Sequence, residues 1–111
     1  MTAWVGVISC ELMVPGAEGL KDKRRAVKSL VERMHRRCRV SVAETGFHDL
    51  HQRAEVTAAV VAGSEGELER LLEALRGLAR ELPEAVVAHW DERVIGGLDA
   101  LDATNEDEFA D

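Results

Sequence analysis

Two groups of polar residues in this sequence have types and spacings that suit chemistry. The first is a basic segment: nine of the 14 Lys and Arg residues fall between positions 21 and 39, where only Asp22 and Glu32 oppose them, so this segment carries a charge of +7. Ammonium and guanidinium groups clustered in this way bind phosphates. The residues predicted to bind an anion or nucleic acid are Lys21, Lys23, Arg24, Arg25, Lys28 and Arg36.

The second group is a polar constellation between positions 44 and 53. Imidazole nitrogens and carboxylate oxygens at such spacing are ligands for divalent metals. The more common interpretation is a polar turn in which Asp49 caps backbone N–H groups and Arg53 pairs with Glu44. We therefore predict no metal here, and a metal-dependent enzyme is the weaker alternative. The members of the constellation are Glu44, His48, Asp49, His51, Gln52 and Arg53.

Signatures of other chemistries are absent from the sequence. No Gly-rich dinucleotide loop, no phosphate-binding Walker loop and no GxSxG motif is present, so we predict no cofactor and no catalytic residue. Tyr is absent and Phe47 falls in a loop, which argues against an aromatic platform for stacking bases.

The hydrophobic pattern alternates between period two and period 3.6 and predicts six elements in the order βαββαβ. Ser64 and Glu67 have the spacing of a capping box at the start of the second helix. This order predicts a ferredoxin-like α+β two-layer sandwich, in which two helices cover one face of a four-stranded antiparallel sheet and strands one and three lie in its centre. The expected strands are 4–14, 40–43, 55–60 and 85–95, and the expected helices are 20–37 and 64–82.

Helical spacing decides which cations of the first helix face solvent. At about 100° per residue, all the predicted anion-binding residues except Lys23 lie opposite the apolar stripe that contains Val27 and Leu30. Lys23 lies close to the stripe, so we expect its aliphatic stem to follow the core and its ammonium group to emerge. The alternative to anion binding is a solvated charged face, with ion pairs to Asp22 and Glu32, or a face covered by the acids of the second helix or by the acidic tail.

The face of the sheet opposite the helices is expected to be small and only partly polar. Such a face, or an uncovered edge strand, is a candidate surface for a homodimer or for a protein partner. The residues on the open face are Val7, Ser9, Ser41, Ala43, Thr57, Ala59 and Val61.

The whole chain of 111 residues has a net charge of -7, which argues against an anionic partner until the charge is divided by segment. Residues 96–111 hold six acidic and no basic residues, so the preceding 95 residues carry only -1. We predict one domain at 1–95 and an acidic, flexible tail at 96–111. The sequence has no secretory signal and no membrane span, and Cys10 and Cys38 fit reduced buried thiols, so we predict a cytoplasmic protein.

Three segments resemble the YlxP-like family of short bacterial proteins of unknown function: LKDKRR at 20–25, SVAE at 41–44 and DLHQR at 49–53. The resemblance covers about residues 4–95 and implies a ferredoxin-like fold. Genes of this family often lie beside translation-initiation and ribosome-maturation genes, which implies an RNA or ribosomal partner. The sequence departs from the family pattern at His51, where Trp is usual, and no catalytic residue is carried over.

Overall fold

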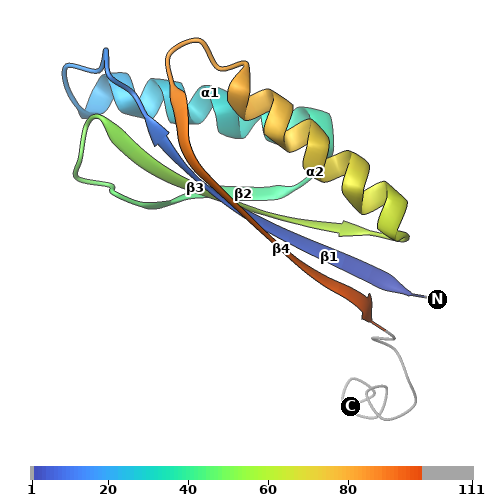
Figure 1. The fold of residues 1–111 in the computed structure, drawn as a ribbon. Helices are drawn as coiled ribbons and strands as arrows, with labels where there is room; N and C mark the ends of the chain where they lie inside the picture. The colour runs from blue at the N-terminus through green and yellow to red at the C-terminus, as the bar shows by residue number, and fades with distance from the viewer. Residues whose placement is uncertain (1, 99–111) are drawn as a thin grey trace, which may run out of the picture.

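The computed structural model describes residues 2–98, which form a helix layer packed on one face of a single sheet (Figure 1). The order βαββαβ is as predicted, and the sheet is antiparallel throughout with the strand order β2-β3-β1-β4. The predicted ferredoxin-like sandwich, with β1 and β3 in its centre, is therefore confirmed. The elements are β1 (Ala3–Met13), α1 (Leu20–Cys38), β2 (Ser41–Gly46), β3 (Arg53–Ala62), α2 (Glu65–Arg80) and β4 (Val86–Leu98).

The core lies between the sheet and the two helices. Alternate residues of β1 and β3, such as Ile8 and Val56, point toward the helices and are fully buried. They meet the apolar stripes of α1 and α2, which bury Leu30 and Leu75 completely. Burying side chains of this size stabilises the fold by about 1.5–3 kcal/mol each relative to exposure.

The two helices begin in different ways. The side chain of Ser64 accepts a hydrogen bond from the Glu67 N–H at 3.2 Å, and the Glu67 carboxylate accepts one from the Gly63 N–H at 3.2 Å, so the predicted cap of α2 is confirmed. Helix α1 follows Gly19, which provides no side-chain cap. Its first N–H groups are therefore left to solvent or to other partners.

Strand β4 continues to Leu98, three residues beyond the predicted end at Ile95. The pair Gly96-Gly97 does not break the strand, and the indole of Trp4 lies directly over Gly96. A Cβ atom built on Gly96 would fall 2.0 Å from Cζ3 of Trp4. The predicted acidic tail otherwise falls on residues 99–111, which lie outside the described residues.

Both cysteines are buried and free, as predicted. Burial raises the pKa of the Cys10 thiol from 9.0 to about 11 and also raises the pKa of Cys38. Neither thiol is set up as a nucleophile at neutral pH, since the thiolate is the reactive form. Within residues 2–98, no helix has the length and apolar character needed to cross a bilayer.

Candidate anion-binding surface

The solvent side of α1 carries a row of cations, which we call the basic face. Its members are all exposed, in agreement with the helical spacing. The rest of the described chain neutralises little of this charge. The one ion pair that they form within residues 2–98 joins Lys28 to Glu32 at 4.0 Å, with both side chains more than half exposed. The basic face consists of Lys21, Arg24, Arg25, Lys28 and Arg36.

Few of the acidic residues that were considered as partners pair with this face. Asp22 accepts a hydrogen bond from the Glu18 N–H at 3.0 Å, where it closes the turn before α1. In the described part of the chain, no acid of α2 forms an ion pair with the basic face. An exposed pair at 4.0 Å, such as Lys28 with Glu32, contributes at most about 0.5 kcal/mol. As far as residues 2–98 are concerned, the cations are thus open to a partner.

Lys23 is not part of the basic face, and the prediction that its ammonium group emerges is wrong. Lys23 is completely buried. Nζ donates hydrogen bonds to the carbonyl oxygens of Phe47 at 2.7 Å and His48 at 3.2 Å, and it lies 3.0 Å from Oε2 of Glu44. That oxygen has no hydrogen-bond partner among the described residues, so the contact with Lys23 is an ion pair without good hydrogen-bond alignment. These contacts hold the Lys23 ammonium group away from solvent anions.

A second group of cations lies near the other end of α1, where three arginines line a hollow of about 280 Å³ beside Leu78 and Glu81. Arg36 is shared with the basic face, whereas Arg33 and Arg37 were not predicted. Their spacing in the sequence was the available signal, because residues three and four apart share one side of a helix. The hollow therefore extends the cationic surface toward α2.

The polar constellation between β2 and β3 does not form the predicted Arg53–Glu44 pair. Glu44 is taken by Lys23, and Arg53 instead binds the carboxylate of Glu11, with Nε 2.8 Å from Oε1. The Arg53 guanidinium also lies 4.2 Å from the ring centroid of Phe47, at cation–π distance. Phe47 has a φ of 59°, so the loop turns sharply at this residue.

The remaining members of the constellation have separate positions. Nε2 of His48 lies 3.2 Å from the carbonyl oxygen of Glu44, and both Asp49 and His51 are exposed. Among residues 2–98, no three His, Cys, Asp or Glu side chains are grouped closely enough to share a metal ion. Asp49 forms no backbone cap in the described chain. The arrangement is that of a structured turn.

Gln52 connects this turn to the loop before α1. Its side-chain Nε2 lies 3.4 Å from the Pro15 carbonyl oxygen and 3.3 Å from that of Ala17. The backbone carbonyl oxygen of Gln52 accepts a hydrogen bond from the Val14 N–H at 2.9 Å. Together with the Lys23 contacts, these bonds fix the first turn of α1 against both neighbouring loops. The polar constellation thus positions the start of the basic face.

The open face of the sheet is uncovered by any element among residues 2–98 (Figure 1). The predicted residues lie on it, since Val7 and Ser41 flank Ala59 across the strands and Val61 is 70% exposed. Its middle is polar: the hydroxyl groups of Thr45 and Thr57 are 2.7 Å apart. The face is therefore accessible and mixed in character.

These features define a small ferredoxin-like domain with a cationic helix. A solved designed protein, Foldit4, has 18% identity and a TM-score of 0.51, over 84% of this chain and 96% of that one. A second designed protein, whose title names a ferredoxin fold, has 14% identity and a TM-score of 0.43, over 90% of this chain and 88% of that one. The likeness to Foldit4 concerns the fold alone.

The chain belongs to the DUF503 family, which is described as "protein of unknown function". The model of this family matches residues 5–92. It is also 30% identical over 80 residues to the uncharacterized protein YlxP of Bacillus subtilis (strain 168). The matched region covers 72% of this chain and 87% of that protein. The family resemblance inferred from LKDKRR, SVAE and DLHQR is thereby confirmed.

Proposed function

We propose that this protein is an accessory protein that binds structured RNA or a ribonucleoprotein through the basic face of α1. The observation that supports the proposal is the row of five exposed cations, of which only Lys28 has an ion-pair partner among residues 2–98. A partner with regularly spaced negative charges would neutralise the row.

The dimensions of the helix suit a backbone rather than a single anion. From Lys21 to Arg36 the helix axis advances about 22 Å at 1.5 Å per residue. A row of this length can contact several neighbouring phosphates of one backbone. The uncapped first turn adds N–H groups and the positive end of the helix dipole. The hollow lined by Arg33, Arg36 and Arg37 adds charge at the opposite end.

The same surface favours recognition of shape over sequence. Trp4 and Trp90 pack against the core, and Phe47 lies under Arg53, so none of the three offers a free ring beside the basic face. Reading of single bases by stacking requires such rings. We therefore expect binding to depend on phosphate geometry and on salt concentration.

Fluorescence anisotropy with a structured RNA, measured across a series of salt concentrations, tests the proposal. The Arg24→Glu/Arg25→Glu variant should bind at least tenfold more weakly at low salt, and its dependence on log salt should be flatter by roughly two phosphate contacts. The matched control is Arg70→Glu/Arg80→Glu, which makes the same charge change on exposed residues of α2. Equal affinity of the wild type and the first variant, or equal losses in both variants, would contradict the proposal.

A further inference from the structure

Strand β4 is an edge of the sheet: no strand among residues 2–98 pairs with its outer side. Its pairing with β1 is irregular at two places, between Glu11 and Leu12 and between Ala3 and Val5. Between these irregularities the ladder is continuous from His89 to Ile95. This regular stretch is seven residues long, and Glu92 stands at its centre.

An unpaired regular edge is a template for another strand, and proteins usually block such edges with Pro, Lys or a bulge. The stretch from His89 to Ile95 contains no Pro, Lys or bulge. Charged side chains also protect edges, but the inward-pointing one, Glu92, is already paired with Arg76 at 3.1 Å. The other edge strand, β2, is different, because it has only six residues and an irregularity of its own between Glu44 and Gly46. Of the two edges, β4 is the one open to regular pairing.

The charges along this stretch are self-complementary. Asp91 and Arg93 flank Glu92 and point to the open face, opposite Ser9 and Val7 of β1. Arg93 is 81% exposed, and its contact with Asp91 of the same strand is long, at 3.7 Å. Glu92 points to the helix face. There its carboxylate forms an ion pair with Arg76 at 3.1 Å and accepts a hydrogen bond from the indole N–H of Trp90 at 2.8 Å.

We propose that β4 is a homodimer interface, in which the stretch from His89 to Ile95 pairs antiparallel with the same stretch of a second copy about a two-fold axis at Glu92. In this register Asp91 of each copy faces Arg93 of the other, and two cross-strand ion pairs form on the open face. Glu92 of each copy also faces Glu92 of the other, on the helix face, where Arg76 of the same copy lies 3.1 Å from each carboxylate and offsets its charge. A shift of the axis to Asp91 or to Arg93 likewise places like charges opposite each other, but it forms neither cross-strand ion pair. The charges thus select one register.

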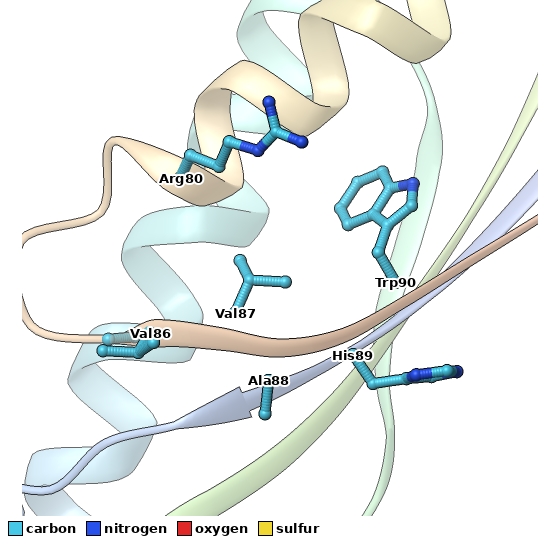
Figure 2. A pocket seen from close by; sticks show the side chains of 7 residues that line it. Arg80, Val86, Val87, Ala88, His89 and Trp90 are labelled. Atoms are coloured by element: carbon cyan, nitrogen blue, oxygen red, sulfur yellow. The ribbon is translucent and has the colours of Figure 1, made fainter.

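The apolar side chains fit the same register. Trp90 faces Val94 of the second copy on the helix side, and Val94 is 47% exposed in one chain. Figure 2 shows that Trp90 and Val87 stand on the side of β4 that faces Arg80, whereas His89 and Ala88 point to the other side. These residues border a hollow of about 460 Å³ between α2 and β4. In the dimer, Val94 of the second copy would lie at its border, beside the indole.

The interface does not depend on the proposed RNA binding, because no residue of the basic face takes part in it. It has a geometric consequence for that function, however. A two-fold axis perpendicular to a continuous sheet keeps the helices of both copies on the same face. The two basic faces would then lie on one side of an eight-stranded sheet, where a single extended anion could contact both.

Sedimentation velocity over a wide range of protein concentrations tests the interface. We expect a dimer for the wild type and a dimer dissociation constant raised roughly tenfold or more for Arg93→Asp, since both ion pairs become like-charge pairs. The swapped variant Asp91→Arg/Arg93→Asp should restore the dimer. The control Arg70→Asp has the same charge change on the exposed side of α2 and should leave the dimer unchanged.

A cysteine at the axis provides a second measurement. Identical residues that face each other across a two-fold axis bring their Cβ atoms to about 4.5–5.5 Å, close to the range for a disulfide. The Glu92→Cys variant should therefore form a covalent dimer under mild oxidation, whereas the wild type, whose two thiols are buried, should not. A monomeric wild type at every concentration, a dimer that survives Arg93→Asp, or a swapped variant that stays monomeric would each overturn the proposal.

Discussion

The ammonium group of Lys23 lies 3.0 Å from Oε2 of Glu44 and joins the first turn of α1 to β2 in the interior of the domain. The side chain of Lys23 is 1% exposed and that of Glu44 is 18% exposed. Burying a charge is costly unless it is paired and hydrogen-bonded. Here the carboxylate and the carbonyl oxygens of Phe47 and His48 supply that compensation.

Replacing Lys23 by Met should destabilise the protein by about 3–5 kcal/mol, because Glu44 then keeps a largely buried charge without a partner. Urea denaturation followed by circular dichroism measures the loss. The control is Lys21→Met, two residues earlier on the exposed side of α1, where we expect a change within about 0.5 kcal/mol. Similar stabilities for the two variants would show that the buried pair contributes nothing.

The sequence predicts the fold because the apolar pattern is local. Ile8 and Leu12 follow the strand period, Leu30 follows the helix period, and Ser64 with Glu67 marks the start of α2. Each of these signals lies within one element, so the order of elements could be derived without knowing any long-range contact. Their order then restricts the topology to a few choices.

The connections of the polar side chains could not be derived in the same way. Lys23 contacts carbonyls 24 and 25 positions away, and Arg53 contacts Glu11 across 42 positions. Those pairings depend on strand register and on the left-handed turn at Phe47, neither of which the pattern of residue types determines. For the same reason, Gly96 looked like the start of a tail, although Trp4 covers it in the sheet.

The Arg53→Lys substitution should lower the free energy of unfolding by about 1 kcal/mol, although it keeps the positive charge. The guanidinium binds the Glu11 carboxylate with more than one N–H group and stacks over Phe47, and a lysine ammonium cannot reproduce both contacts. Thermal unfolding at constant pH provides the measurement. Arg70→Lys, on the exposed side of α2, is the control and should leave the melting temperature unchanged; an equal effect in both variants would contradict a specific role for Arg53.

The stability of the protein should fall between about pH 9 and pH 11 because of Cys10. Burial raises the pKa of this thiol from 9.0 in the unfolded chain to about 11 in the fold. Below pH 9 both states hold the proton and the contribution is fully present; between the two pKa values only the unfolded chain loses its proton, so unfolding becomes more favourable. The loss should approach about 3 kcal/mol at the upper end.

Denaturation curves of the wild type and of Cys10→Ala at several alkaline pH values separate this effect from the titration of surface lysines. The Ala variant is less stable at neutral pH because it leaves a small cavity, but its stability should change less steeply above pH 9. Parallel pH profiles for the two proteins would show that the Cys10 thiol does not cause the alkaline loss.

The contact between Trp4 and Gly96 should make that glycine intolerant of any side chain. A Cβ atom at position 96 would lie 2.0 Å from one indole carbon and 2.4 Å from another, so Gly96→Ala should force the ring away and cost about 1–3 kcal/mol. The matched control is Gly77→Ala within α2, where nothing lies within 4 Å of the added atom and the better helix propensity of Ala should stabilise the protein by up to about 1 kcal/mol. In a Trp4→Ala background the indole is gone, so the cost of Gly96→Ala should nearly disappear. An undiminished cost in that background would mean that the backbone of β4, and not the indole, requires glycine.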